Sequence, residues 1–251
     1  MTIIVLIAAV IMGFTLGLLG GGGSILAVPI LVYLAHVDEK VAIATSLLVV
    51  GVTSLGAVIG HAKAGNVSLK IGLIFGVFAM AGAAIGGQIA KFIPGGVLLG
   101  IFAGFMLITA IMMLRGGSSN LKPSEEVKKN LPILKIGGEG LLVGAVTGLV
   151  GAGGGFLVVP ALVLLGGLPM RLAIGTSLMV ISMKSLAGFA SFASYVPIDW
   201  TMATTFAGAA IVGSFAGAQV STRIDANKLR KGFAVFVLVM GVVILAQKLF
   251  L

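Results

Sequence analysis

The sequence has no cysteine and few charged residues. The absence of cysteine from all 251 residues excludes a disulfide framework, thiol catalysis and a cysteine-based zinc site. Only 9% of the residues are charged, against about 25% in soluble proteins, and 59% are hydrophobic. A soluble domain of this composition would expose apolar surface on every face. We therefore expect one integral membrane domain whose surroundings are the lipid bilayer.

Acidic residues are scarce relative to basic ones, with 7 against 16 and a net charge of +9. In a soluble protein this excess would suggest nucleic-acid binding. Here the basic residues lie between apolar segments, which favours loops on the cytoplasmic side of a membrane over a nucleic-acid partner. Residues 1–19 have no basic leader and no small-residue cleavage site followed by polar sequence. They are predicted to be a retained membrane segment.

The chain contains two sets of four uninterrupted apolar stretches. They cover residues 3–35, 41–62, 69–90 and 95–114, and then 139–168, 172–196, 201–221 and 232–251. The first stretch of each set exceeds the roughly 20 residues that one helical crossing needs, and it has glycines in its middle. We predict an all-α polytopic membrane protein with repeats at residues 1–114 and 138–251, joined by a polar cytoplasmic loop at residues 115–137.

The two sets arise from an internal duplication. A shift of 131 residues without a gap gives 32 identities in the 98 positions from Gly13 to Ala110, against roughly a tenth expected for so skewed a composition. The shift aligns Gly20 with Gly151 and Pro29 with Pro160. Each repeat is therefore expected to have the same fold.

The distribution of basic residues indicates that the repeats are inverted. If each long first stretch folds back at its glycines, each repeat crosses the membrane an odd number of times, and three basic residues lie on one side and twelve on the other. The twelve are Lys63, Lys70, Arg115, Lys122, Lys128, Lys129, Lys135, Arg171, Arg223, Lys228, Arg230 and Lys231. Continuous crossings would divide the same loop charges eight against seven. The fold-back arrangement predicts a cytoplasmic central loop and both termini outside, in the cell (inner) membrane.

Two glycine clusters are the first candidate substrate site. They comprise Gly20, Gly21, Gly22, Gly23 and Ser24 in the first repeat, and Gly151, Gly153, Gly154 and Gly155 in the second. Each glycine costs about 1 kcal/mol relative to alanine in a helix, so the clusters are predicted to break each long stretch into a hairpin of two half-helices. The N-terminus of a half-helix offers free N–H groups and partial positive charge to an anion. Close helix packing is the alternative role for these glycines. A nucleotide-binding loop is disfavoured because no strand precedes either cluster.

Lys184 lies in the middle of the apolar stretch 172–196, about 18 Å from either end of a helix. Its side chain cannot reach an interface from there, and a buried charge needs a wet cavity or a partner. The aligned residue in the first repeat is Thr53. We predict that Lys184 contacts an anion, with a structural pair as the alternative.

Further polar groups recur at equivalent depths in the two repeats. Hydroxyl donors come from Thr45, Ser46, Thr176 and Ser177, and amides from Gln88 and Gln219. We include all six in the candidate substrate site, although such hydroxyls often bond only their own helix backbone. His61 ends an apolar segment and is expected at the membrane interface. Glu139 is expected to open a helix at the cytoplasmic boundary.

The paired motifs resemble those of a known family. GLLGGGGSILAVP and GLVGAGGGFLVVP, each followed by an ATSL or GTSL segment in a chain of this length, are similar to the TauE/SafE sulfite exporter family. The resemblance implies a polytopic transporter of sulfite, sulfonates, thiosulfate or related small anions. It carries over to Gly20–Ser24, Pro29, Thr45 and Ser46 and to their aligned residues in the second repeat. Lys184 lies outside the motif.

The leading hypothesis is a secondary anion transporter that works by alternating access. An anion channel or a cation carrier is one alternative, although few carboxylates lie inside the apolar stretches. An intramembrane hydrolase using Ser24 or Ser177 with His61 is the other. No cofactor, metal or catalytic residue is expected. Assembly into a homo-oligomer stays open.

Overall fold

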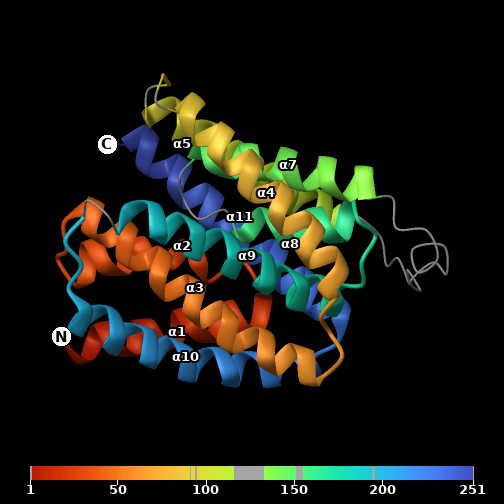
Figure 1. The fold of residues 1–251 in the computed structure, drawn as a ribbon, viewed down its shortest axis with the longest axis horizontal. Coiled ribbons are helices and arrows are strands. Elements are labelled where there is room, and N and C mark those ends of the chain that lie inside the picture. Colours follow the sequence, from red (N-terminus) through yellow and green to blue (C-terminus); the bar gives the residue numbers. More distant parts are fainter. Residues whose placement is uncertain are drawn as a thin grey trace.

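The computed structural model describes residues 2–90, 92–93, 95–115, 133–150, 155–193 and 196–250 (Figure 1). The helices are α1 (Ile3–Leu19), α2 (Ser24–Pro29), the π-helix η1 (Ile30–Leu34), α3 (Glu39–Lys63), α4 (Leu69–Ala90), α5 (Gly95–Arg115), α7 (Ile133–Val150), α8 (Gly155–Leu164), α9 (Met170–Phe192), α10 (Trp200–Arg223) and α11 (Ala226–Phe250). The described residues contain no β-strand, which confirms the predicted all-helical fold. Five of these helices are long and apolar enough to cross a membrane.

The first long apolar stretch breaks at its glycines, as predicted. Gly20 ends α1 with φ +82°, a conformation that glycine adopts without strain, and its N–H donates to the Leu16 carbonyl at 2.8 Å. The chain becomes helical again at Ser24, and the π-helix η1 follows Pro29. In the second long stretch α7 ends before the aligned glycines and α8 begins after them. The site candidates Gly151, Gly153 and Gly154 lie outside the described residues.

The same helix contacts occur twice, with the two repeats exchanged. α1 packs on α10, where Gly13 lies against the Ala210 carbonyl. α7 packs on α4, where Gly144 lies against the Ala79 carbonyl. The 131-residue shift converts the first pair of residues into the second. The helices approach so closely in both places because glycine has no Cβ to separate the backbones.

α3 and α9 are equivalent helices and pack against each other in opposite directions near the centre of Figure 1. Gly51 of α3 lies beside Leu186, whereas Leu47, one turn earlier in α3, lies beside Gly188, which comes later in α9. Equivalent helices that run antiparallel are what an inverted duplication requires. How the two repeats are oriented in a membrane stays a prediction.

Two helices begin earlier than the apolar pattern predicts. α7 begins at Ile133, so the last five residues of the predicted loop 115–137 are helical, and Glu139 lies in the second turn of α7 and does not open it. α11 begins at Ala226, and the side chain of Asp225 caps it by accepting from the Asn227 N–H at 2.9 Å. Helices extend beyond the apolar stretches because polar first turns can stand outside the hydrocarbon.

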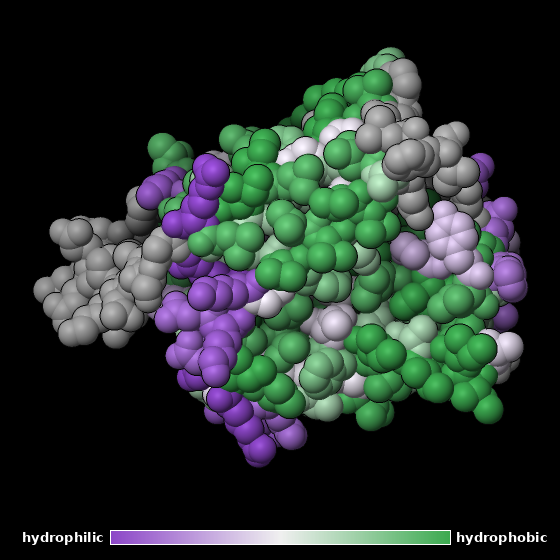
Figure 2. All heavy atoms as spheres, turned by 180° about the vertical axis from the view of Figure 1, so that it is seen from behind, coloured by the Kyte–Doolittle hydropathy of each residue, from purple (hydrophilic) through white to green (hydrophobic). Residues whose placement is uncertain are grey.

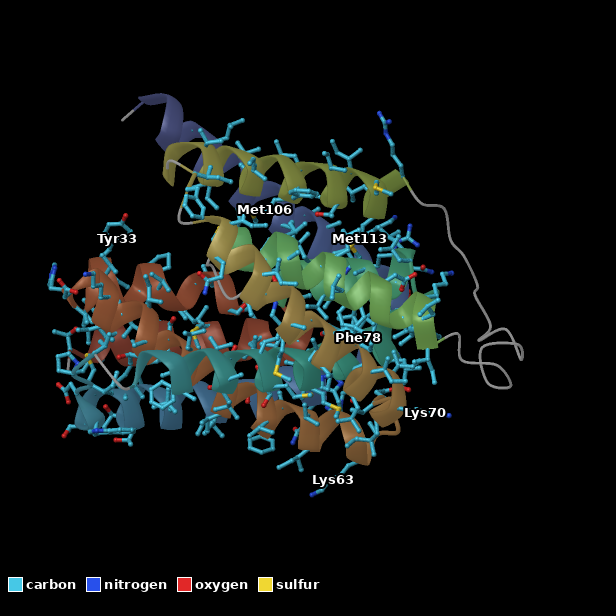
Figure 3. The ribbon with its side chains drawn as sticks, turned by 45° about the horizontal axis from the view of Figure 1, so that its top comes forward. Tyr33, Lys63, Lys70, Phe78, Met106 and Met113 are labelled. Atoms are coloured by element: carbon cyan, nitrogen blue, oxygen red, sulfur yellow. The ribbon has the colours of Figure 1, made fainter. Side chains whose placement is uncertain are left out.

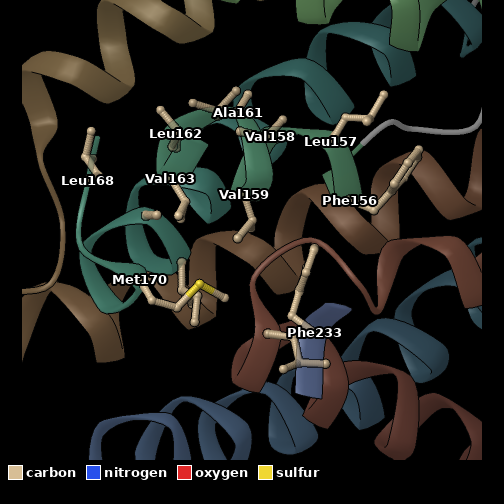
Figure 4. Close-up of a cluster of buried hydrophobic side chains, with 14 of the residues drawn as sticks. Phe156, Leu157, Val158, Val159, Ala161, Leu162, Val163, Leu168, Met170 and Phe233 are labelled. Carbon is tan, nitrogen blue, oxygen red and sulfur yellow. The ribbon is translucent and has the colours of Figure 1, made fainter. Parts of the chain in front are cut away.

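α8 is the most enclosed element. Every residue from Gly155 to Val163 is buried, and Figure 4 shows Phe156 and Val159 of α8 in one cluster with Phe233 of α11. A helix that is apolar all round belongs in the interior. The N-terminus of α8 therefore lies deep inside the molecule.

The surface has a broad apolar belt and a polar end. Large apolar side chains such as Ile4, Leu142 and Val212 are 62–67% exposed, and green residues cover most of the face in Figure 2. The larger group of purple residues lies at one end of that face, and a smaller group lies along the opposite edge. Lys63 and Lys70 lie at this end, and Tyr33 lies at the other (Figure 3). The exposed basic residues of the same end are Lys63, Lys70, Arg115, Lys135, Arg223, Lys228 and Lys231.

Candidate functional site

The two short helices that follow the glycine clusters meet at their first residues. Gly21 lies against the carbonyl of Gly155, where a Cβ on Gly21 would overlap the Gly155 backbone. A Cβ on Gly155 would in turn lie 2.8 Å from Ser24 Oγ. Ser24 begins α2 and Gly155 begins α8. Two helix N-termini from different repeats thus come together in the interior.

α9 passes beside this junction and contacts it on one face. Ser177 Oγ lies 2.7 Å from where a Gly20 Cβ would stand, and Ile181 packs against Gly155. The two hydroxyls here already have partners, because Ser24 Oγ donates to the Gly21 carbonyl and Ser177 Oγ donates to the Ile174 carbonyl, both at 2.7 Å. These hydroxyls keep lone pairs but have no free proton to donate in this conformation.

Lys184 follows Ile181 by one helical turn. Its Nζ donates to Thr147 Oγ1 at 2.5 Å, and Thr147 Oγ1 donates to the Gly144 carbonyl at 3.0 Å. Thr147 is buried in the last turn of α7, just before the second glycine cluster. No carboxylate pairs with Lys184 among the described residues. The structure thus gives Lys184 a neutral partner and leaves its charge without a counter-ion there.

The remaining candidates from the sequence lie in different places. Gly22 packs against Phe236, and Gly23 packs against α1. Thr176 Oγ1 accepts the Ser68 N–H at 3.0 Å and so holds the α3–α4 connection. Gln88 and Gln219 are exposed on α4 and α10. The structure does not bring these two glutamines to the glycine junction.

The α3 residues of the candidate set are buried. Ser46 Oγ donates to the Ile43 carbonyl at 2.8 Å. Thr45 Oγ1 is buried and has no hydrogen-bond partner in the part of the chain that the structure describes. An unpartnered buried hydroxyl is unfavourable unless a ligand or water completes it.

Three further buried hydroxyls were not included in the candidate site predicted from the sequence. Thr53 and Ser54 of α3 and Ser185 of α9 are 0–2% exposed, and their hydroxyls have no partner among the described residues. Ser54 and Ser185 belong to the turns of α3 and α9 that include the Gly51–Leu186 contact, whereas Thr53 lies beside α10, where its carbonyl is 3.5 Å from Ser214 Oγ. The signal was present in the sequence, because Ser54 and Ser185 are identical residues that align when the sequence is shifted by 131 residues.

His61, which was expected at the membrane interface, is buried within the helix bundle. His61 is 0% exposed, and its Nε2 lies 2.9 Å from the Gly17 carbonyl of α1. It is buried because the last turn of α3 packs between the end of α1 and the start of α9, where Gly175 leaves room for the histidine. Neither ring nitrogen bonds a serine among the described residues. The arrangement gives no support to a Ser–His nucleophile.

Acidic residues take little part in this interior. The described residues contain no group of three or more His, Cys, Asp or Glu that could hold a metal ion. Glu139 lines a small cavity with Lys135, Phe75 and Leu168 near the basic end of the bundle. The interior site is therefore built from helix N-termini, hydroxyls and one lysine, a set that suits an anion better than a cation.

Comparison with known proteins fits this architecture. The sequence profile described as "Sulfite exporter TauE/SafE" matches residues 5–244, which is nearly the whole chain. The chain belongs to the TauE/SafE family. This TauE/SafE protein is a multi-pass membrane transporter, and its glycine junction lies in the part of the chain that the family profile covers.

Relatives of this TauE/SafE protein occur in bacteria and archaea. A "Probable membrane transporter protein" of Xylella fastidiosa is 34% identical over 238 residues, covering 94% of this chain and 91% of the relative. YdhB of Bacillus subtilis is 25% identical over 244 residues, covering 96% and 99%. MJ0441 of Methanocaldococcus jannaschii is 28% identical over 259 residues, covering 94% of both chains. No solved structure matches the chain.

Proposed function

We propose that this protein is a secondary transporter of small sulfur oxyanions, such as sulfite, thiosulfate or sulfonates, that works by alternating access. The observation that carries the proposal is the contact between Gly21 and Gly155. It brings the N-termini of two helical arms, residues Ser24–Leu34 and Gly155–Leu164, to one place in the interior.

The chemistry of this junction favours an anion. Each arm begins at the junction, and the N-terminus of a helix carries partial positive charge. Lys184 adds a full positive charge nearby, and its partner Thr147 is neutral and can be exchanged for an oxyanion. A cation would find no carboxylate in the described parts of α1, α2, α8 and α9. Glycine allows the ligand to approach the backbone closely.

The repeated architecture supports alternating access. The exchanged contacts of α1 on α10 and of α7 on α4 favour two equivalent conformations in which the junction opens toward one side or the other. In the present conformation the two glycines are in contact, so the junction is closed. Opening requires one arm to move relative to the other. Ser54 and Ser185, whose buried hydroxyls have no partner among the described residues, belong to α3 and α9, the helices that would slide past each other.

The substrate class and the membrane orientation rest on different arguments. The family is described as "Sulfite exporter TauE/SafE", and this description favours sulfur oxyanions as the substrate class. The basic end, which includes Lys63 and Lys70, is assigned to the cytoplasm by the excess of positive charge. The termini then lie on the outer side of the cell membrane.

The test is flux of labelled substrate in proteoliposomes. Sulfite, thiosulfate and sulfoacetate are each loaded inside, and exchange for the same anion outside is measured. Chloride is the control for anion selectivity, and a sodium salt is the control for cation transport. We expect saturable exchange of at least one sulfur oxyanion. An anion channel would instead give conductance without saturable counterflow. Absence of exchange for all three anions overturns the proposed function.

A further inference from the structure

His61 is a buried titratable group that the proposed site leaves unused. Its Nε2 lies 2.9 Å from the Gly17 carbonyl. That carbonyl lies in the last turn of α1 and lacks its helical partner, because the Gly21 N–H turns to the Leu19 carbonyl at 3.1 Å. A carbonyl can only accept, so Nε2 carries the proton and donates it. Nδ1 then has a lone pair, and it is buried with no hydrogen-bond partner among the described residues.

The imidazole lies beside the backbone that forms the glycine junction. Its partner Gly17 precedes Gly20 by three residues. On the other side, a Cβ on Gly175 would lie 3.0 Å from the His61 Cβ, and Gly175 precedes Ser177 by two residues. His61 therefore contacts α1 three residues before Gly20 and contacts α9 two residues before Ser177. Gly20 and Ser177 both lie beside the glycine junction.

The charged groups on the elements around His61 are all cations at this end of the bundle. They are Lys63 of α3, Arg171 at the start of α9 and Arg223 at the end of α10, while α1 has no charged residue. Asp225, two residues after α10 ends, is acidic, and its side chain accepts the Asn227 N–H at the start of α11. Glu39 of α3 and Asp199 before α10 lie at the opposite ends of their helices. An imidazolium at His61 would thus be a buried cation without a carboxylate partner. An anion at the glycine junction would supply the missing negative charge.

We propose that His61 is the proton-binding site of the transporter, and that one proton crosses the membrane together with each anion. The proposal rests on the proposed anion transport. The proton adds to the lone pair of Nδ1 while the anion is bound, and it returns to water when the site opens on the other side. The coupling is reciprocal: the bound anion favours the proton by the same factor as the proton favours the anion.

The duplication sets the stoichiometry. Position 192 in the second repeat, which aligns with His61, is Phe192, and the only other histidine of the chain is His36, exposed between η1 and α3. Each chain therefore has one such proton site. His36 supplies a matched control at the opposite end of α3.

The first test compares exchange with gradient-driven uptake in proteoliposomes. Thiosulfate and sulfoacetate are the probes because both are fully ionised near neutral pH, so a pH change acts on the protein. In His61→Gln the amide N–H can still donate to Gly17, but the side chain binds no proton. We expect acid on the anion side to accelerate wild-type uptake. Uptake by His61→Gln should be at least about tenfold lower than wild-type uptake and should not respond to the pH gradient. His36→Gln should behave as wild type.

The second test needs no transport and no folded variant. Thiosulfate or sulfoacetate is added to the detergent-solubilised wild type in weak buffer, and a pH indicator should report uptake of about one proton per chain. Exchange without any pH-gradient effect and without proton uptake overturns the inference and leaves the proposed function standing. Gradient-driven uptake by His61→Gln equal to wild type also overturns it. Failure of every anion to exchange is the separate outcome that overturns the proposed function, and the inference with it.

Discussion

Gly21 of the first repeat lies against the main-chain carbonyl of Gly155 in the second, so the glycine-broken arms of both repeats touch in the interior. The contact is backbone to backbone, which only residues without a Cβ permit. It makes the junction sensitive to single methyl groups.

Replacing Gly21 by alanine adds only one methyl group but should strongly reduce transport. The new Cβ would overlap the Gly155 backbone, which cannot move aside as a flexible side chain would. We expect a loss of roughly 1–3 kcal/mol of stability and strongly reduced anion exchange. Melting temperature and exchange rate are the measurements. Gly208→Ala in α10 is the control, because nothing lies within 4 Å of its new Cβ. Normal exchange by Gly21→Ala would mean that the junction does not take part in transport.

Replacing Lys184 by methionine should weaken anion binding. A hydrogen bond from a charged group contributes roughly 1.5–3 kcal/mol, which corresponds to about a tenfold to hundredfold loss of affinity. Anion-dependent thermal stabilisation measures it.

Thr147→Val separates this role from a structural one. It removes the hydroxyl that Lys184 bonds but keeps the lysine charge, so we expect a much smaller loss of anion affinity. An equal loss in both variants would show that the Lys184–Thr147 bond is structural.

Replacing Ser54 and Ser185 by alanine should slow exchange without destabilising the fold. Their hydroxyls are buried and without partners among the described residues, so removing them costs no protein hydrogen bond and can raise the melting temperature. Ser214→Ala is the control, because the Ser214 hydroxyl is also buried but bonds the Ile211 carbonyl at 2.8 Å. Unchanged exchange in the Ser54→Ala, Ser185→Ala double variant would exclude these hydroxyls from the anion path.

Single cysteines can report the membrane orientation, since the natural chain has none. Tyr33→Cys and Lys63→Cys place thiols at opposite ends of the bundle (Figure 3). With the basic end in the cytoplasm, an impermeant maleimide should label Tyr33→Cys in intact cells and Lys63→Cys only after permeabilisation. The reverse labelling pattern would invert the proposed orientation.

The candidate site was recovered from the sequence in part. The break at Gly20 and the depth of Lys184 could be predicted, because glycine cost and helical rise are local properties of the chain. Thr147 and His61 could not. Thr147 is significant only because α7 ends beside Lys184. His61 was expected at the interface because it ends an apolar segment. That position in the sequence does not show which helices cover the side chain.

Gln88 and Gln219 were predicted as ligands from the sequence, but the structure does not place them at the site. They are equivalent residues in the duplication, which made them attractive as ligands. The structure exposes both, on α4 and α10. Symmetry in the sequence reports a shared ancestry of the two helices, and it does not say which face of each helix points inward.

The sequence alone determined that this is a helical membrane protein built by duplication, since composition, apolar length and self-similarity are all written along the chain. Only the tertiary structure decided that Gly21 meets Gly155, that Lys184 bonds Thr147 and that His61 is buried against Gly17. The reason is that these contacts join residues from different helices, and the register between packed helices is set by side-chain and backbone fit across the whole bundle.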